Sequence, residues 1–254
     1  MDNTPILEVK NVSKYFGSVV ANKNVNITVN RGEVLAILGE NGSGKTTLMN
    51  MIAGIYYPDE GSIFVNGKEA DIRSPQDAFK YKIGMVHQHF KLVDIFTAAQ
   101  NIVLGLNDEK YKMKEISSKA YDIAMKYGFE LDPDKKVYNM SVSEKQTVEI
   151  IKVLYRGADL LILDEPTAVL TPQEIDKLFN VVRAMRADGK SILIITHKLN
   201  EVMAISDRVA VLRKGEYITT VNTKETTEQQ LTEMMVGKKV ELKIDRVKTE
   251  VQKP

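Results

Sequence analysis

One short segment of the chain predicts both a local backbone structure and the kind of ligand that this structure would bind. Gly39–Thr46 follows the pattern G-x-x-x-x-G-K-[ST], and it comes directly after Val34–Leu38, which is apolar throughout. A short, continuously apolar run is typical of a parallel strand that is buried on both faces. Glycines after such a strand let backbone N–H groups curve around phosphate oxygens, and the N-terminus of a following helix adds its positive end. The segment, the phosphate loop, therefore predicts a nucleotide site between a buried strand and a helix that begins at Lys45.

Individual residues of the phosphate loop have expected tasks. Lys45 is expected to place a point charge on the β- and γ-phosphates, and the Thr46 hydroxyl is expected to ligate magnesium. The residues predicted to contact the nucleotide in this region are Gly39, Asn41, Gly42, Ser43, Gly44, Lys45, Thr46 and Thr47. A glycine-rich turn without a ligand is the alternative, and the strand before it and the helix after it make that alternative weak.

A second apolar run, Leu160–Leu163, ends in two carboxylates, Asp164 and Glu165. At the end of a strand, Asp164 is expected to hold magnesium, usually through water, and Glu165 is expected to orient and polarise an attacking water. Two solvated acids that open a loop are a common alternative. Because these two follow a buried strand in a chain with a phosphate loop, we favour the catalytic interpretation.

Strand-like runs alternate with helical ones, which predicts an α/β fold. Three apolar runs are expected to form central parallel strands, namely Val34–Leu38, Leu160–Leu163 and Ile192–Ile195. Between the last two, apolar residues recur at helical spacing, and Thr171-Pro172 before them is typical of a helix start. Strand, crossover helix and strand make one parallel βαβ unit.

The remaining parts of the chain have different patterns. Ile6–Val12 and Val25–Val29 alternate apolar and polar residues as antiparallel strands do, and Ser62–Val65 is a strand between two turns. Residues 96–155 show helical patterns and no convincing strand, which predicts a helical insertion of about sixty residues. The tail after Val240 is expected to be a linker or a terminal extension.

Composition excludes several classes of protein. The chain is 43% hydrophobic, and its 35 Lys and Arg balance 34 Asp and Glu, so it lacks the basic footprint of a dedicated nucleic-acid binder. It has no cysteine, which excludes disulfides, thiolate metal sites and cysteine nucleophiles. Its longest apolar run, five residues, is far shorter than the ~20 of a membrane span, and its start lacks the features of a signal peptide. We expect a soluble, cytoplasmic protein.

These motifs together resemble the ATP-binding subunits of ABC transporters, over residues 4–240. Pro166-Thr167 matches the family's extended second motif. Gln88 looks like the glutamine that, in the family, contacts magnesium and the attacking water. His197 looks like the switch histidine that senses the γ-phosphate, and Phe16 looks like the aromatic residue that stacks on adenine. Each match is weak alone, whereas their order and spacing together are strong.

The resemblance implies a complete site and a fold. The expected cofactors are ATP and Mg²⁺. The implied catalytic residues are Lys45, Gln88, Glu165 and His197, and the implied metal ligands are Thr46, Gln88 and Asp164. The implied fold is a P-loop ABC ATPase with a RecA-like core, an antiparallel β subdomain and an inserted α-helical subdomain. Residues 1–240 would form the ATP-binding domain, with its core at 1–88 and 158–224 and its helical subdomain at about 89–157; residues 241–254 would be a linker or tail.

Four segments narrow the resemblance to importers of nucleosides and simple sugars. These are Gly84–Phe90, Asn101–Gly105, Tyr155–Asp159 and Thr167–Glu174. In that family one ATP-binding protein usually carries two such modules, and we expect this chain to be the N-terminal half of such a tandem protein. The implied partners are a second ATP-binding module, transmembrane permease subunits and, indirectly, a substrate-binding protein, with no nucleic acid. The implied place is the cytoplasmic face of the cell membrane, where the chain would be peripheral.

One segment departs from the family pattern. The family's signature, Leu-Ser-Gly-Gly-Gln, aligns with Met140–Glu144, which we name the signature segment; Ser141 is kept, Val142 and Ser143 stand at the two glycines, and Glu144 replaces the glutamine. In the family this segment reaches across a dimer to the partner's γ-phosphate. Glu144 is expected to add unfavourable negative charge there, and Ser143 to restrict close backbone approach. Ser141-x-x-Glu144 also predicts a capping box that opens a helix.

Two other functions are compatible with a phosphate loop. A soluble ABC-type ATPase acting on DNA or ribosomes is the first alternative. DNA-repair versions insert long coiled coils between the phosphate loop and the signature, whereas in this chain Ser141 comes only 96 positions after Lys45. A small-molecule kinase, the second alternative, would not need Gln88, Pro166-Thr167 and His197 together. An ATPase that powers an importer stays the leading hypothesis.

Overall fold

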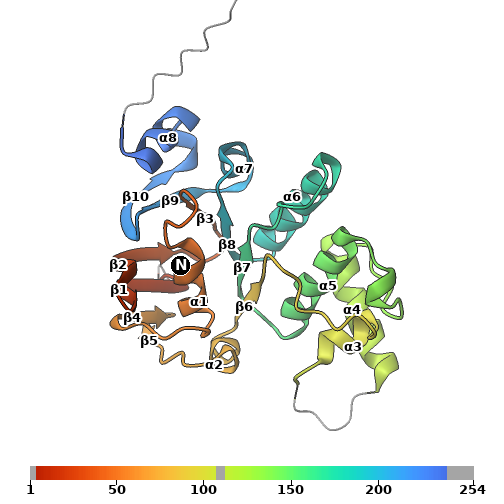
Figure 1. Cartoon of the computed structure of the whole chain (residues 1–254). Helices are drawn as coiled ribbons and strands as arrows, with labels where there is room; N and C mark the ends of the chain where they lie inside the picture. Colours follow the sequence, from red (N-terminus) through yellow and green to blue (C-terminus); the bar gives the residue numbers. More distant parts are fainter. Residues whose placement is uncertain (1–3, 107–111, 239–254) are drawn as a thin grey trace, which may run out of the picture.

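The computed structural model describes residues 4–106 and 112–238, which form a ten-stranded sheet with helices around it (Figure 1). The strands are β1 (Leu7–Phe16), β2 (Val19–Val29), β3 (Val34–Leu38), β4 (Glu60–Val65), β5 (Lys68–Glu69), β6 (Ile83–Val86), β7 (Leu160–Asp164), β8 (Ser191–Thr196), β9 (Arg208–Arg213) and β10 (Glu216–Asn222). The helices are α1 (Lys45–Ile52), α2 (Pro75–Lys80), α3 (Ala98–Val103), α4 (Met113–Tyr127), α5 (Val142–Tyr155), α6 (Pro172–Ala187), α7 (Leu199–Ile205) and α8 (Glu228–Val236). The tail predicted at 241–254 lies outside the described residues.

The sheet has a parallel part and an antiparallel part. Its strand order is β5-β4-β1-β2-β10-β9-β3-β8-β7-β6. The strands β9, β3, β8, β7 and β6 run parallel to one another. The strands β5, β4, β1 and β2 pair antiparallel, and β10 joins the two parts. The α/β prediction and the three central parallel strands, which are β3, β7 and β8, are therefore confirmed.

Some strands differ from the sequence prediction. β1 continues to Phe16 and β2 already begins at Val19, because register shifts within this pair break the alternation on which the prediction relied. The sequence pattern also does not predict β6, which contains Gly84. A Cβ atom at Gly84 would collide with the side chain of Val153 on α5, so this glycine permits a close approach between strand and helix.

The buried strand β3 contributes to both sides of the sheet. Leu35 and Ile37 belong to the apolar cluster that contains α1, whereas Ala36 and Leu38 belong to a cluster with α7, α8 and β9. Successive side chains of a strand point to opposite faces, so a strand covered on both faces must be apolar at every position. This is the physical reason for the uninterrupted apolar run before the phosphate loop.

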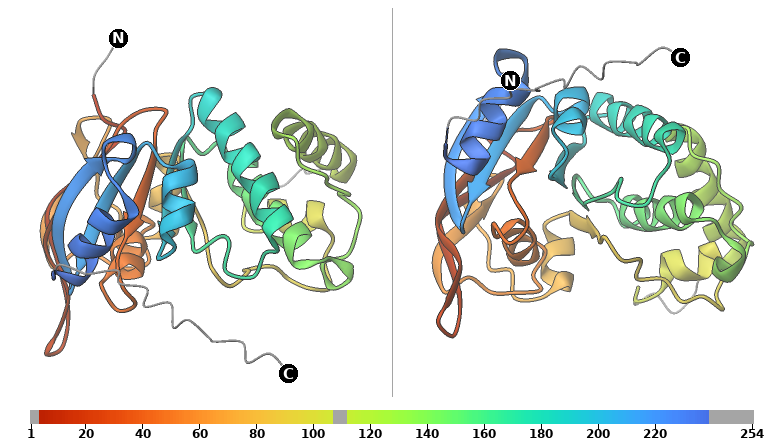
Figure 2. Two further views of the ribbon diagram at one scale, coloured as in Figure 1. Left: turned by 90° about the horizontal axis from the view of Figure 1, so that it is seen from above. Right: turned by 45° about the horizontal axis from the view of Figure 1, so that its top comes forward.

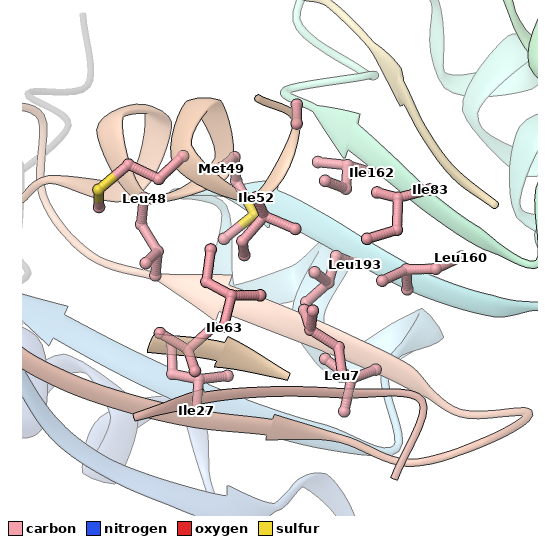
Figure 3. Packing of buried hydrophobic residues seen from close by; sticks show 14 of the residues in the cluster. Leu7, Ile27, Leu48, Met49, Ile52, Ile63, Ile83, Leu160, Ile162 and Leu193 are labelled. Atoms are coloured by element: carbon pink, nitrogen blue, oxygen red, sulfur yellow. The ribbon is translucent and has the colours of Figure 1, made fainter. Parts of the chain in front are cut away.

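Helix α1 is fixed by its apolar face. Leu48, Met49 and Ile52 are fully buried, and Figure 3 shows them directed toward the side chains of the surrounding strands. Complete burial of three such side chains contributes about 1.5–3 kcal/mol each to stability. The position of α1 against the sheet determines where Lys45, its first residue, stands relative to the end of β3.

The helices α3, α4 and α5 lie beyond the β6 edge of the sheet (Figures 1 and 2). Between residues 96 and 155 the described part of the chain contains no strand, as predicted, and only an isolated bridge between Thr97 and Lys136. An apolar cluster continues from Leu161 of β7 through α6 and α5 to Ala120 of α4. The boundaries at 88/89 and 157/158 stay predictions. Within the described ranges, no helix combines the length and the apolar character that a membrane span requires.

Candidate functional site

Four parallel strands end side by side at one edge of the sheet. Leu38 of β3 pairs with Thr196 of β8, Ile195 of β8 with Asp164 of β7, and Leu163 of β7 with Val86 of β6. In open α/β sheets, ligands bind at the carboxyl ends of the strands. The phosphate loop, His197, Glu165 and Gln88 each follow one of these four strand ends, so the register brings four segments that are far apart in sequence to one edge.

The phosphate loop has a backbone that only glycine permits at two positions. A Cβ atom at Gly39 would collide with the backbone of Leu212 and the side chain of Ser43. Gly44 has a φ of 92°. A Cβ there would collide with the backbone carbonyl oxygen of Ala21 and would lie 2.6 Å from the side-chain nitrogen Nδ2 of Asn22. No side chain caps α1 at Gly44, so the first N–H groups of the helix remain available to an anion.

Lys45 lies folded back over the phosphate loop. Its side chain is nearly fully buried, and Nζ donates hydrogen bonds to the carbonyl oxygens of Gly39 (2.7 Å) and Glu40 (2.9 Å). Burial lowers the pKa of Lys45, while the nearby carboxylates of Glu165 and Asp164 act in the opposite direction. The predicted contact residues Asn41, in the loop, and Thr46, in the first turn of α1, are both exposed, as a surface that receives phosphates requires.

Asp164 is buried at the end of β7 without a full set of hydrogen bonds. Its side chain is 5% exposed, and in the described part of the chain Oδ1 has no hydrogen-bond partner; the same holds for the buried Oγ of Ser43 in the phosphate loop. Burial, and then the negative charge of Glu165, raise the pKa of Asp164 to about 6, against the effect of Lys45. Buried oxygen atoms without partners cost free energy. A cation shared with phosphate oxygens would remove that cost, so these residues fit Mg²⁺, which is commonly bound by one or two carboxylates and substrate phosphates.

Glu165 contacts two other predicted site residues, Gln88 and His197. Its Oε2 accepts a hydrogen bond from Nε2 of Gln88 (3.2 Å), and its Oε1 lies 3.1 Å from Nδ1 of His197. An ionised carboxylate only accepts hydrogen bonds, so Nδ1 of His197 is the donor. Glu165 also has a φ of 44°, a conformation that is uncommon for residues other than glycine, and its N–H bonds to the carbonyl of Ile195. The backbone therefore holds this side chain in an unusual orientation between two neighbouring strand ends.

Phe16 lies at the end of β1, in the hairpin next to the phosphate loop. It pairs with Val19 of β2, and the same strand contains Ala21, whose carbonyl lies against Gly44. The ring is 43% exposed and packs edge-on against Tyr56, with ring centroids 5.2 Å apart. An exposed aromatic ring held at a fixed angle can stack on a base, and the sequence pattern gave no signal for the supporting Tyr56.

The signature segment lies at the start of α5, with the inserted helices and apart from α1 (Figure 1). The predicted capping box is confirmed: Ser141 Oγ accepts from the N–H of Glu144 (3.2 Å), and Glu144 Oε2 accepts from the N–H of Ser141 (2.7 Å). Lys135 bonds to the other carboxylate oxygen of Glu144 at 2.6 Å and is the main cause of its lowered pKa. The negative charge expected at Glu144 is therefore paired within the chain. Ser143 and the exposed Val142 follow Ser141 in the first turn of the helix.

Behind the site lies a buried carboxylate that the sequence did not single out. Glu201 of α7 is 3% exposed and accepts hydrogen bonds from the hydroxyls of Thr167 (2.6 Å) and Thr196 (3.1 Å). Lys198 lies 3.0 Å from the same carboxylate. Glu201 thus connects the segment after β7, which carries Glu165, with the last residue of β8, which directly precedes His197. A charged residue in the first turn of a short helix has no distinguishing sequence signal.

Comparisons with known proteins agree with this geometry. The protein-family model described as ABC transporter matches residues 22–168. The chain is 47% identical over 243 residues to the nucleoside import ATP-binding protein NupA of Lactococcus lactis, an alignment that covers 94% of this chain and 48% of that protein. It is 44% identical over 240 residues to the ribose import ATP-binding protein RbsA of Caldanaerobacter subterraneus, with 93% of this chain and 48% of that protein covered. Among solved structures, it is similar to cbiO1 from Clostridium perfringens, with a TM-score of 0.78 and 31% identity over 90% of this chain and 93% of that one. The chain spans about half the length of the curated relatives it matches.

The raised pKa of Asp164 predicts a pH dependence of stability in the absence of Mg²⁺. Between about pH 4 and pH 6 the folded chain keeps a proton on Asp164 that the unfolded chain has lost, so the free energy of unfolding falls as pH rises through this range. We expect Asp164→Asn to flatten this slope and to raise the unfolding temperature near pH 7. Thermal unfolding in EDTA across this range measures both effects, with the exposed Asp122→Asn as the control. An unchanged slope in Asp164→Asn would contradict the assignment.

Proposed function

The chain belongs to the ABC transporter family of ATP-binding proteins, and from that premise we propose that it binds and hydrolyses ATP to power a membrane importer of nucleosides or simple sugars. The observation that supports hydrolysis most directly is the placement of Glu165 between Gln88 and His197, beside the phosphate loop. The two relatives are named as nucleoside import and ribose import proteins, which supports the proposed class of cargo.

The phosphate loop supplies the binding part of the proposal. Its N–H groups and the start of α1 would surround the phosphates, and Lys45 would exchange its two carbonyl partners for the β- and γ-phosphate oxygens. Thr46, Asp164 and Gln88 would hold Mg²⁺, which when bound neutralises charge on the phosphates. The ring of Phe16 would stack on adenine. The unpartnered oxygens of Asp164 and Ser43 support this arrangement, because a bound nucleotide and its cation would give them partners.

Hydrolysis requires a water held in line with the γ-phosphate. Glu165 would orient and polarise that water, since each carboxylate oxygen has a second lone pair besides the one used in its present hydrogen bond. Gln88 and His197 hold the two oxygens from opposite sides and so fix the plane of the carboxylate. His197 would in addition sense the γ-phosphate through its remaining ring nitrogen. Oriented general-base help of this kind contributes typically 10²–10⁴-fold to a rate.

The proposed partners follow from the exposed signature segment and from the relatives. Ser141 and Val142 are exposed at the start of α5, apart from α1 of their own chain, so the signature segment would complete the site of a second ATP-binding module. The relatives are about twice as long as the matched region, which supports a longer protein. We propose, from the sequence resemblance, that this chain is the N-terminal module of a tandem protein. The segment from Gln88 to Phe96, in which Gln88, His89, Lys91, Asp94 and Ile95 are exposed, would contact a permease subunit at the cytoplasmic face of the membrane. A substrate-binding protein would be an indirect partner, because it would deliver cargo to the permease and not to this chain.

Nucleotide binding should depend on Lys45. We expect Lys45→Ala to abolish measurable binding of Mg-ATP in a titration, because no other buried cation of the described residues lies at the phosphate loop. The exposed Lys68→Ala serves as the control and should bind normally. Unchanged affinity in Lys45→Ala would remove the basis of the proposed function.

Hydrolysis should depend on Glu165. We expect Glu165→Gln to keep ATP binding and to lose about 10²–10⁴-fold in hydrolysis, because a neutral amide cannot polarise water. Single-turnover hydrolysis with the natural partner module measures this loss, and Glu115→Gln on the surface of α4 is the control. A rate equal to that of the unmodified chain would show that another group performs the step.

The signature segment should limit dimerisation of the isolated chain. Ser143→Gly with Glu144→Gln removes a Cβ at the phosphate contact and frees the Lys135 cation, while Gln at this position still completes the capping box. In a Glu165→Gln background we expect these changes to increase ATP-dependent dimerisation, measured by size-exclusion chromatography with and without ATP; Glu130→Gln is the control. Tight ATP-driven dimers of the unmodified chain would contradict the expected handicap.

A further inference from the structure

Two side chains of one helix hold the two segments that carry Gln88 and Glu165. These are Gln146 and Glu149 of α5, which are 5% and 3% exposed. Residues three apart on a helix are neighbours on the same face. Neither residue belongs to a motif that the sequence analysis singled out.

Glu149 anchors the segment that follows Gln88. Its Oε1 accepts a hydrogen bond from the backbone N–H of Lys91 at 2.9 Å. Residues 87–96 form neither helix nor strand, so this N–H has no place in a regular backbone ladder. Lys152, one turn further along α5, contacts the carbonyl of the same Lys91 at 3.5 Å. The chain is thus fixed to α5 three residues after Gln88.

Gln146 anchors the segment that follows Glu165. Its Nε2 donates a hydrogen bond to the carbonyl of Pro166 at 2.7 Å, and both groups are buried. Pro166 is the residue directly after Glu165, and proline has no N–H of its own to offer a neighbour. The carbonyl is therefore the one backbone group through which this residue can be held by a hydrogen bond.

The two anchors hold the two segments that meet in the contact between Gln88 and Glu165, one anchor on each segment. β6 and β7 end next to each other, and beyond their ends the chain leaves the sheet in two segments. Side chains one turn apart on a rigid helix fix how far those segments can separate. We propose that Gln146 and Glu149 are positioning residues, which set the 3.2 Å contact between Gln88 and Glu165 by holding Lys91 and Pro166 to one face of α5. This inference rests on the proposed function, because it assigns the two residues to the hydrolytic site.

Packing alone does not require polar residues at these two positions. α5 is already held by buried apolar side chains on the same part of the helix, namely Val148, Ile150, Ile151 and Val153. Burying a carboxylate or an amide costs free energy unless each is hydrogen-bonded, and apolar side chains would suit a buried helix face better. What the two polar residues add is a fixed distance to two backbone groups.

The experiment compares leucine with the conservative exchange at each position in the full chain. Glu149→Gln keeps an oxygen that can accept from Lys91, whereas Gln146→Glu loses the donor to Pro166 when ionised. We expect Glu149→Leu, Gln146→Leu and Gln146→Glu each to lower kcat for ATP by about tenfold or more with KM changed less than about twofold, since a misplacement of about 1 Å costs up to ~10²-fold. Glu149→Gln should restore most of the rate.

A second background separates positioning from folding. If Glu149 acts through Gln88, Glu149→Leu should have little further effect on kcat in a Gln88→Ala chain. An equal loss in both backgrounds would overturn the inference. Hydrogen–deuterium exchange gives a readout independent of turnover: Glu149→Leu should speed exchange in 87–93, Glu149→Gln should not, and unchanged exchange in the leucine variant would overturn the inference. If the unmodified chain binds no ATP, the proposed function fails, and the exchange result alone then decides whether Glu149 anchors the segment.

Discussion

The parallel register of β3, β8, β7 and β6 is the constraint on which the rest of the structure depends. Because these strands end at the same level, the phosphate loop, His197, Glu165 and Gln88 leave the sheet together. The strands β3, β7 and β8 are buried on both faces, and they are apolar throughout apart from the ends of β7 and β8. The register is therefore stable, because sliding any of these strands would expose apolar side chains or break its backbone hydrogen bonds to the neighbouring strands. The site is therefore formed by segments from four strand ends, which the register of the sheet brings together, and not by a single loop.

Charge at this edge is balanced only in part without a ligand. Asp164 and Glu165 are adjacent acids, and the buried Lys45 is the cation that acts on both. Burial, and then the charge of Glu165, raise the pKa of Asp164, and among the described residues its buried Oδ1 has no hydrogen-bond partner, whereas Glu165 has both oxygens engaged. A buried carboxylate with a shifted pKa and an unpaired oxygen at a strand end is typical of a site for a charged ligand. The surrounding structure compensates for the cost of this group without removing the group.

The sequence predicted the structural features that residues close together in the chain determine, and it missed side-chain contacts between residues far apart in the chain. The phosphate loop, the start of α1 at Lys45 and the capping box at Ser141 follow from local patterns, and all three have the predicted backbone. The meeting of Gln88, Glu165 and His197 came from family resemblance, because it requires a strand order that no local pattern encodes. Lys135, Glu149 and Gln146 gave no signal, since each acts on a group nine or more residues away, and two of the three act on backbone atoms that look alike in every residue.

The folded-back position of Lys45 has a consequence for selectivity. Its ammonium group already has two carbonyl partners, Gly39 and Glu40, so an incoming anion must compete with the loop for the same protons. A charge-assisted bond to a carbonyl is substantial, and a weakly charged or singly bonded anion gains little by displacing it. A ligand with several closely spaced negative oxygens can bond several loop N–H groups at once, so we expect it to displace the carbonyls more readily. From the two carbonyl contacts of Lys45 we therefore expect the phosphate loop to favour polyphosphates over simple anions.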